Sequence, residues 1–518
     1  MRMPDETPLL LDGGALTVDE VREVARGRKV AIAESALQRL KEARALVFEL
    51  SEQKTPVYGL NRGVGWNKDK AIDKAFFARY NRNLILSHCA GAGPEASREE
   101  TRAILLVRLN GLLQGYTGIQ PEIAERYAEF LNLGIHPAIP LCGSVGAADI
   151  TSISHIGLAL IGEGEVEYAG RRLAAAEALR EAGLSPLALG PKDGLAVVSS
   201  NALSAGIGAL ALGEAETLLE LADLVYALSL EAIRGNVSPL HEAVHRVRPY
   251  PGQLQSRERI VRYLEGSDLW SDYNPDSLQD PLSFRDACQI HGAARDALRY
   301  TREQLELHLS CSDDNPCLIA EEKLILSNAN FDPVVWTLGF EMLGSALHHV
   351  SKSSCYRIIK LGDPRFTGLT RFLTPDETAS IGFCTVQKTA TSLDAEIRHL
   401  TNPASADYFS LAGDIEDHAT NAPYVVYKTR EIIDRVYYIL AIELMHAAQA
   451  VDLRGKDLRL GTGTKAAYEA LRESVPYLSA DRSLTGDIEQ AYRVLKNGKL
   501  AEDAQALLRR ERERERYR

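Results

Sequence analysis

Residues 213–233 read GEAETLLELADLVYALSLEAI, and this stretch decides the expected fold. Leu218, Leu221, Val225 and Leu228 recur at intervals of three and four residues, the spacing of one apolar helix face. The acidic side chains fall on the opposite face, at Glu216, Glu220 and Asp223. The pattern therefore predicts a long amphipathic helix.

The same pattern returns further along the chain. Residues 431–451 (EIIDRVYYILAIELMHAAQAV) and 333–354 (PVVWTLGFEMLGSALHHVSKSS) both show helical apolar spacing, while alternating β-branched runs are few and short. The fold class is predicted as mostly α, with a long-helix bundle. Turn residues near 185–195 suggest a division into a loop-rich N-terminal domain, 1–200, and a bundle domain, 201–518.

Composition excludes several classes of partner. The 518 residues are 45% hydrophobic and 25% charged, with a net charge of −12 and no basic block, so no nucleic-acid partner is expected. The N-terminal residues have no apolar run of signal-peptide length, and the acidic residues within 203–233 argue against a membrane span. Seven scattered cysteines favour reduced thiols and a cytoplasmic location.

One metal motif is a coincidental match by our interpretation. Residues 241–245 read HEAVH, which fits the H-E-x-x-H pattern of zinc proteases. Pro239 precedes it, and the following RVRPYPG breaks any helix within two turns. No convincing third ligand follows, so no metal site is predicted.

Several stretches, in order along the chain, resemble one family. They contain a glycine-bearing tyrosine loop, two Asn-containing segments, a Gln-Asp…Arg segment, an Asp-Asn-Pro segment and a Glu-Asp-His segment. They are TPVYGLNRGVGWN (55–67), RNLILSHCAGAG (82–93), VRLNGLLQGYTGI (107–119), LQDPLSFRDACQIHGAARDAL (278–298), DDNPCLIAEEKLILSNANFDP (313–333) and NPASADYFSLAGDIEDHATNA (402–422). As an ordered set they resemble the histidine and aromatic amino-acid ammonia-lyases and their aminomutase relatives.

The resemblance implies a fold, an assembly and a cofactor. The fold is the helix bundle of the ammonia-lyase and fumarase type, with residues 201–518 as the oligomerisation core. The assembly is a homotetramer in which three subunits line each active site. The cofactor is a methylidene-imidazolone that an Ala-Ser-Gly tripeptide forms by cyclising and dehydrating.

The loop at that position departs from the family. Where the family reads G-S-V-G-A-S-G-D-L, this chain reads GSVGAADI (143–150), one residue short. Ala147, Ala148 and Asp149 include neither the serine that dehydrates nor the glycine whose amide closes the ring. We therefore expect that the cofactor does not form here.

Other cofactor-side positions have changed with it. The second catalytic tyrosine of the family corresponds to Leu282, and its Asn-Gly-Thr segment corresponds to Ser199 and the two residues after it. The threonine of the family's first loop is Arg62. Because the substrate-side positions persist, the pattern suggests a repurposed enzyme.

The resemblance assigns three catalytic candidates. Tyr58 matches the tyrosine that takes the β-proton, although a loop tyrosine also suits a turn-capping role. A tyrosine base needs a nearby positive charge to lower its pKa, and Arg62 is the candidate, with a solvated arginine as the alternative. Glu416 matches a glutamate that acts as acid, base or amine partner; a solvated helix-face carboxylate is equally compatible.

Five residues are substrate-binding candidates. Arg285 suits bidentate binding of a carboxylate, with an ion pair to a neighbouring aspartate as the alternative. Gln279 and Asn315 match positions near that carboxylate, or serve as caps and turns. His88 and Phe331 match positions near the substrate side chain, with core packing as the alternative.

Three functions remain open from sequence. The first is an enzyme that acts on an amino-carboxylate or related small molecule by acid–base elimination, addition, isomerisation or cyclisation, without the cofactor. Such an enzyme needs a better leaving group, or a more acidic proton, than an ordinary amino acid offers. The second is a conventional ammonia-lyase or aminomutase acting on histidine or an aromatic amino acid. The third is a non-catalytic binding or regulatory homologue.

Overall fold

Helices dominate the computed structural model, which confirms the predicted fold class. The structure describes residues 7–52, 56–270, 278–406, 408–455, 458–504 and 506. Within them the strands form only two- and three-stranded sheets: a parallel β1–β2 pair, the antiparallel pairs β3–β5 and β8–β9, and the order β4–β6–β7.

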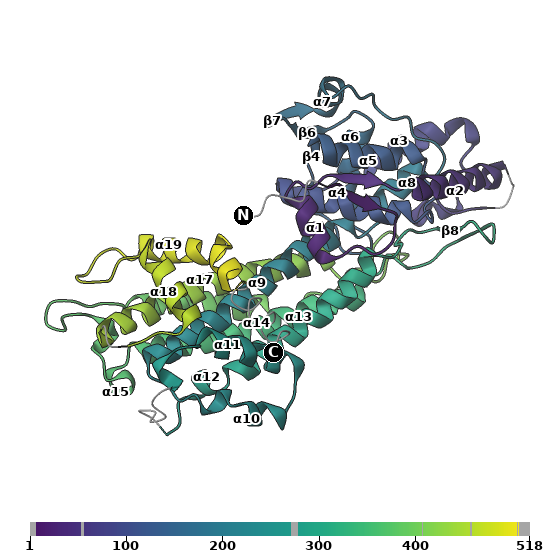
Figure 1. Cartoon of the computed structure of the whole chain (residues 1–518). Coiled ribbons are helices and arrows are strands. Elements are labelled where there is room, and N and C mark those ends of the chain that lie inside the picture. The colour runs from purple at the N-terminus through teal and green to yellow at the C-terminus, as the bar shows by residue number, and fades with distance from the viewer. Residues whose placement is uncertain are drawn as a thin grey trace.

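The N-terminal part is built from short elements and forms the upper lobe in Figure 1. Its strands are β1 (Leu9–Leu11), β2 (Val30–Ile32), β3 (Ala92–Glu95), β4 (His136–Pro137), β5 (Pro140–Cys142), β6 (Glu165–Tyr168) and β7 (Arg171–Ala174). Its helices are α1 (Val18–Ala25), α2 (Glu34–Glu52), α3 (Phe77–His88), α4 (Arg98–Leu113), α5 (Pro121–Leu133), α6 (Ile150–Leu160), α7 (Ala175–Glu181) and α8 (Asp193–Val198).

The remaining chain contains the long helices. They are α9 (Ala202–Ala232), α13 (Ala287–Leu309), α14 (Val334–Leu361) and α17 (Ala422–Arg454). Around them lie α10 (Glu242–Arg246), α11 (Pro251–Tyr263), α12 (Leu282–Arg285), β8 (Cys317–Ile319), β9 (Leu324–Leu326), α15 (Pro364–Thr367), α16 (Val386–Leu400), α18 (Thr462–Arg472) and α19 (Thr485–Lys496). The three stretches whose spacing predicted long helices are α9, α14 and α17.

The long helices pack side by side and carry one continuous apolar core into the N-terminal part. α9 contacts α13 and α17, and α14 contacts α13 and α17 (Figure 1). Segments 193–232 and 422–454 are long and apolar enough to cross a membrane, but 94% and 83% of their apolar windows are buried in the chain. The change to long helices falls at Ala202, near the proposed boundary. Because one core cluster joins both parts, the two-domain division stays a prediction.

The expected polar face of α9 is wrong in one respect. Glu220 and Asp223 do not face solvent but are buried, at 2% and 0% exposure. Arg259 pairs with Glu220 at 2.6 Å, and Arg295 pairs with Asp223 at 2.6 Å. α11 and α13 pack against α9, and arginines from those two helices compensate the buried carboxylates.

Both histidines of the HEAVH segment form hydrogen bonds within the chain. His241 caps α10, with Nδ1 accepting from the Ala243 amide at 3.1 Å. His245 donates from Nε2 to the Pro239 carbonyl at 2.8 Å and accepts at Nδ1 from Gln253 at 3.0 Å. Both ring nitrogens of His245 are therefore occupied. Among the described residues no group of three His, Cys, Asp or Glu side chains is placed to hold a metal.

Candidate active site

The loop in the cofactor position, residues 143–149, lies where three helices begin. Asp149 directly precedes α6, Asn201 directly precedes α9 and Asn421 directly precedes α17. Asn201 donates from Nδ2 to the Gly146 carbonyl at 3.2 Å, and the Asn421 amide donates to the Val145 carbonyl at 2.7 Å. The loop is therefore fixed to the starts of α9 and α17 by side-chain and backbone hydrogen bonds.

Asp149 anchors the end of this loop. Its amide donates to the Ser200 carbonyl at 2.6 Å, and its Oδ2 accepts from both the amide and the hydroxyl of Ser204 at 2.8 Å. Burial raises the pKa of the Asp149 carboxyl to about 7, against the lowering effect of the Ser204 hydrogen bonds. This buried carboxyl therefore gains or loses its proton close to neutral pH.

The residues at this position do not fit a methylidene-imidazolone. Ala148 is 5% exposed, adopts φ 54° and has no hydroxyl to lose. The amide that would have to close the ring belongs to Asp149, and it is committed to the Ser200 carbonyl. Glycine permits the tight backbone approach of such a ring closure, and no glycine follows Ala148.

A group of buried charged side chains contacts the Ser199–Asn201 segment, which in turn holds the 143–149 loop. Asp313 accepts at Oδ2 from the Ser200 hydroxyl at 2.8 Å and the Asn201 amide at 2.7 Å. Lys192 pairs with Asp314 at 2.5 Å, and both side chains are 0% exposed. Because buried ions are costly unless paired, this group holds the Ser199–Asn201 segment in one position. Ser199, the residue after the end of α8, is buried, and its amide donates to the Leu195 carbonyl.

Tyr58 lies on the loop after α2. Val57 and Leu60, its neighbours on that loop, pack against the apolar face of α2. The Tyr58 hydroxyl oxygen accepts from the Gly65 amide at 2.9 Å. Burial raises the Tyr58 pKa, the Gly65 hydrogen bond lowers it, and the charge of Glu416 raises it further. The single chain therefore favours the neutral phenol, and a positive charge that the single chain does not supply is needed to make Tyr58 a base.

Arg62 does not take the role expected from sequence. Its guanidinium donates from Nη1 to the Asp69 carbonyl at 3.2 Å, and its backbone forms a bridge with Ala71. Arg62 is not among the groups that shift the pKa of Tyr58, and that pKa is raised rather than lowered. The expected lowering of the Tyr58 pKa by Arg62 is therefore wrong for the single chain, because the guanidinium is used to close its own loop.

Glu416 is brought to Tyr58 by the contact of two loops. A turn closed by backbone hydrogen bonds between Leu411 and Glu416 lies against the Tyr58 loop. A Cβ built on Gly413 would lie 2.7 Å from Cδ2 of Trp66, so the indole rests directly on the Gly413 backbone. A Cβ on Gly65 would lie 3.9 Å from Oε1 of Glu416.

Asn315 and Phe331 lie on segments that contact the loops of Tyr58 and Glu416. Asn315 accepts at Oδ1 from the Asn328 amide at 3.0 Å, and Pro316, next in sequence, lies near Gly59. Phe331 precedes Asp332, which pairs with His418 at 3.1 Å on the segment that carries Glu416. The structure therefore brings the Tyr58, Asn315, Phe331 and Glu416 segments together.

His88 ends α3 beside the start of the 143–149 loop. Its Nδ1 donates to the Leu84 carbonyl at 2.7 Å, so Nε2 takes no part in this hydrogen bond. Gly91, three residues after His88, lies close to Gly143, because a Cβ built on Gly143 would lie 3.2 Å from the Cα of Gly91. His88 is thus placed near the loop, with one ring nitrogen oriented by its own helix.

Gln279, Leu282 and Arg285 lie elsewhere. Arg285 donates from Nε to the Asp280 carbonyl at 2.8 Å, and the Gln279 side-chain oxygen, with its amide turned towards the guanidinium, accepts from Nη1 at 2.7 Å and Nη2 at 2.9 Å. Leu282 is 62% exposed. All three belong to α12 and the residues before it, and Figure 1 shows α12 at the opposite end of the molecule from α2 and α3. One chain alone does not bring Arg285 to Tyr58.

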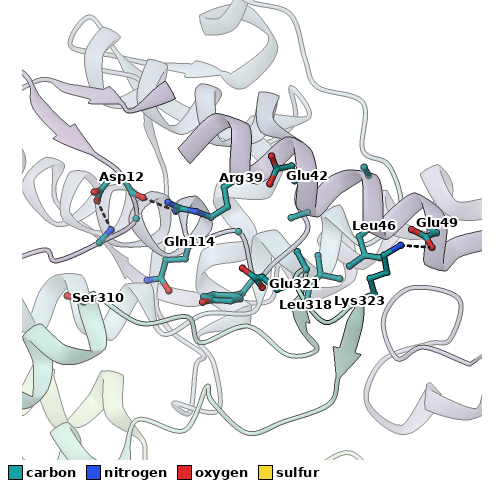
Figure 2. Close-up of a pocket in the computed structure, with 17 residues that line it drawn as sticks. Asp12, Arg39, Glu42, Leu46, Glu49, Gln114, Ser310, Leu318, Glu321 and Lys323 are labelled. Carbon is teal, nitrogen blue, oxygen red and sulfur yellow. Dashed lines mark hydrogen bonds and ion pairs between the residues drawn. The ribbon is translucent and has the colours of Figure 1, made fainter. Parts of the chain in front are cut away.

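A hollow of about 660 Å³ in the N-terminal lobe is separate from these residues (Figure 2). It lies between α2, the turn that follows α4 and the β8–β9 hairpin, and none of the predicted site residues lines it. Arg39 at its edge donates to the Asp12 and Leu113 carbonyls, and Lys323 pairs with Glu49 at 3.6 Å. Its cationic side chains therefore already have partners in the chain.

Two residues at the site were not selected from sequence. Ser204, the third residue of α9, carries the hydrogen bonds to Asp149, and the sequence gave no signal of that contact. Tyr408 lies within the 402–422 motif, and its pKa is raised by burial and by the charge of Glu416. It has no counterpart in the family pattern, so only the structure reveals its place.

Comparison with known proteins agrees with this geometry. Residues 16–473 match the family described as aromatic amino acid lyase. Histidine ammonia-lyase from Alkaliphilus oremlandii is 36% identical over 496 residues, which cover 95% of this chain and 98% of that protein.

Solved structures give the same result. Ergothionase from Treponema denticola, an ergothioneine-degrading enzyme, is 49% identical with a TM-score of 0.93, covering 95% of this chain and 99% of that one. Its crystal structure contains desmethyl-ergothioneine sulfonic acid. Tyrosine aminomutase from Streptomyces globisporus is 33% identical with a TM-score of 0.90, covering 96% and 98%. The chain therefore belongs to the aromatic amino acid lyase family and is a lyase-type enzyme.

Proposed function

We propose that this enzyme eliminates a tertiary amine from a betaine of a histidine-type amino acid, without a methylidene-imidazolone. The observation that carries the proposal is the 143–149 loop, whose residues do not fit the cofactor. The likeness to ergothionase supplies the substrate class, since ergothioneine is the trimethylammonium betaine of a 2-thioimidazole amino acid.

The chemistry of a betaine removes the need for the electrophile. The cofactor of the family captures a free amine and so improves it as a leaving group. A trimethylammonium nitrogen has no lone pair with which to attack an electrophile, and it already leaves as a neutral amine. A chain that lost the cofactor but kept a base and a carboxylate site is therefore suited to such a substrate.

The proposed reaction needs one base and one anchor. The Tyr58 phenolate takes the proton from Cβ, the electrons of that C–H bond form the Cα=Cβ double bond, and the Cα–N bond breaks to release trimethylamine. A cationic substrate beside Tyr58 lowers the pKa that burial and Glu416 raise. Arg285 and Gln279 bind the substrate carboxylate. His88, Asn315 and Phe331 border the substrate.

This proposal includes assembly of several copies, with a homotetramer as the expected form. α12, which contains Arg285, lies at the opposite end of the molecule from α2 and α3, between which Tyr58 lies in sequence, so a complete site takes the two residues from different copies. α14 presents two short apolar stripes at three- and four-residue spacing, exposed in the single chain: Val335, Leu338 and Met342 near its start, and Tyr356 and Ile359 near its end. Such a stripe on a long helix is typical of a helix–helix interface.

The test combines a mass measurement with a turnover assay. The intact mass of the purified protein should equal that of the encoded chain, and ergothioneine should yield trimethylamine and an α,β-unsaturated acid. Tyr58→Phe and Arg285→Ala should each abolish release of trimethylamine, while Tyr250→Phe, an exposed tyrosine on another surface, should not. Full turnover by Tyr58→Phe or Arg285→Ala would refute the roles assigned to them.

The second candidate is a conventional histidine ammonia-lyase, which the names of the curated relatives favour. It requires the cofactor, and therefore predicts a mass lower by two waters together with release of ammonia from histidine. Those two results together would replace the first proposal with this one.

A further inference from the structure

The hollow between α2, the turn after α4 and the β8–β9 hairpin contains a buried amide without a partner. Gln114 belongs to its lining, where Figure 2 shows it between Asp12 and Glu321, and it is only 9% exposed. The side-chain nitrogen Nε2 of Gln114 is buried and has no hydrogen-bond acceptor among the described residues. A buried N–H donor without an acceptor costs free energy. The hollow therefore offers a fixed donor that an oxygen of a ligand would satisfy.

The charges around this amide are only partly neutralised within the described part of the chain. Arg39 forms both of its hydrogen bonds from Nη1 to uncharged backbone carbonyls, and no described carboxylate pairs with it. Glu42 accepts a hydrogen bond from the uncharged Gln38 amide at 2.9 Å. Neither Glu42 nor Glu321 forms an ion pair with a described residue, although both line the hollow. One positive and two negative charges are thus available to a ligand.

This set of groups distinguishes ligands by their charge. A simple anion suits Arg39 and Gln114 but is repelled by the two glutamates, and a simple cation suits the glutamates but is repelled by Arg39. A zwitterion places its carboxylate against the guanidinium and the amide, and its ammonium against Glu42 and Glu321. The ring of Tyr116, 38% exposed on the same lining, offers an apolar face to the rest of the ligand.

The hollow also joins elements that are far apart in sequence. The base of the β8–β9 hairpin is held by a backbone hydrogen bond from the Leu318 amide to the Tyr116 carbonyl at 2.8 Å. The tip of the hairpin is linked to α2 by the ion pair of Lys323 and Glu49, whose side chains are 69% and 53% exposed. Exposed ion pairs contribute little to stability, so the tip is weakly restrained. A ligand that contacts both α2 and the hairpin would restrain it further.

We propose that this hollow is a second, non-catalytic site that binds an α-amino acid zwitterion with an apolar side chain, and that the ligand fastens the tip of the β8–β9 hairpin to α2. Gln114 and Arg39 bind the carboxylate of the ligand, and Glu42 and Glu321 bind its ammonium. The apolar side chain lies on the Tyr116 ring. None of the residues with a role in the proposed reaction lines the hollow, so the inference does not depend on that reaction.

The test compares three probes by calorimetry on the full-length protein. L-Phenylalanine carries both charges, phenethylamine lacks the carboxylate, and 3-phenylpropionate lacks the ammonium. Gln114→Leu removes the amide, and Glu321→Gln removes one carboxylate. Glu322→Gln is the matched control, because Glu322 is the next residue along the chain, is exposed and does not line the hollow.

The wild type should bind phenylalanine at least about 10-fold more tightly than either analogue, since each analogue loses hydrogen bonds to a charged group. Gln114→Leu should weaken phenylalanine binding by about 10-fold for the same reason. Glu321→Gln should weaken it by about 3-fold, the range of an exposed ion pair, and Glu322→Gln should leave it unchanged. Phenylalanine should also slow amide hydrogen exchange in residues 317–326 of the wild type, but not of Gln114→Leu at the same concentration.

Several results would overturn the proposal. Absence of saturable phenylalanine binding would remove the site, and equal binding by the wild type and Gln114→Leu would place the ligand elsewhere on the protein. An analogue that binds as tightly as phenylalanine would show that the hollow does not recognise both charges. Binding without slower exchange in the hairpin would refute the restraint of its tip. If Gln114→Leu does not fold, equal affinities of Glu321→Gln and Glu322→Gln would refute the site on their own.

Discussion

Replacing Asp149 with asparagine should remove a large part of the pH dependence of stability. Asparagine has nearly the same shape, and its oxygen still accepts from the Ser204 amide and hydroxyl, which both bond Oδ2 in the wild type. It cannot ionise. The variant therefore removes the titrating group at the end of the 143–149 loop. Its amide nitrogen replaces Oδ1, which is buried without a hydrogen-bond partner among the described residues, and the cost of that change is the same at every pH.

The expected magnitude follows from the burial of this carboxyl. Its pKa rises from an ordinary 3.8 to about 7 in the folded protein. A raised carboxyl pKa means that the folded state binds the proton more tightly, so this contribution to stability is complete below pH 3.8 and is lost as the pH rises to about 7. Each tenfold difference in proton affinity is worth about 1.4 kcal/mol, so between pH 5 and pH 8 the loss is about 3 kcal/mol.

The assay is urea unfolding of the wild type and Asp149→Asn at pH 5 and pH 8. The free energy of unfolding of the variant, minus that of the wild type, should be larger by about 3 kcal/mol at pH 8 than at pH 5, because only the wild type loses this stability as the pH rises. Burial also raises the pKa of Glu231 to about 7, but Glu231 is present in both proteins and cancels in the difference. The same difference at both pH values would refute the conclusion that Asp149 titrates near neutrality.

Three further substitutions test other parts of the site. Lys192→Met leaves the buried Asp314 without its closest cation, and urea unfolding should show a loss of about 3–5 kcal/mol. A Cβ at Gly146 (φ 85°) would lie 2.8 Å from the first backbone nitrogen of α17, so Gly146→Ala should lower the free energy of unfolding by more than about 1 kcal/mol and reduce kcat. Arg62→Gln should leave unchanged the pH at which kcat/KM rises, since Arg62 does not shift the Tyr58 pKa; a displaced pH profile would restore its expected role.

The helices α9, α14 and α17 could be predicted from sequence because each has an apolar period of its own. The acidic face of α9 could not be placed, because periodicity shows that Glu220 and Asp223 share a side but not that Arg259 and Arg295 cover that side. Their pairing depends on the packing of α11 and α13 against α9, which local spacing does not encode.

The site was predictable only as a set of residue types. The Tyr58 and Glu416 motifs lie far apart in sequence, yet their loops meet in the fold. The expectation for Arg62 assumed that four residues along a loop place a guanidinium beside a phenol, whereas the loop turns Arg62 towards Asp69. Tyr408, whose pKa is raised by burial and by the charge of Glu416, had no sequence signal, since an aromatic residue in a loop is equally compatible with packing.

The placement of α12 at the opposite end of the molecule from α2 and α3 also bears on genetics. Under the proposed assembly, a copy that lacks Tyr58 still lends Arg285 to another copy's site, and a copy that lacks Arg285 still lends Tyr58. Two inactive alleles expressed together should then regain activity in mixed assemblies, to about one quarter of the wild-type level if the copies mix at random. Conversely, copies that lack Tyr58 or Arg285 should inactivate some of the sites that they share with wild-type copies. Dilution to monomers should abolish activity without unfolding the chain.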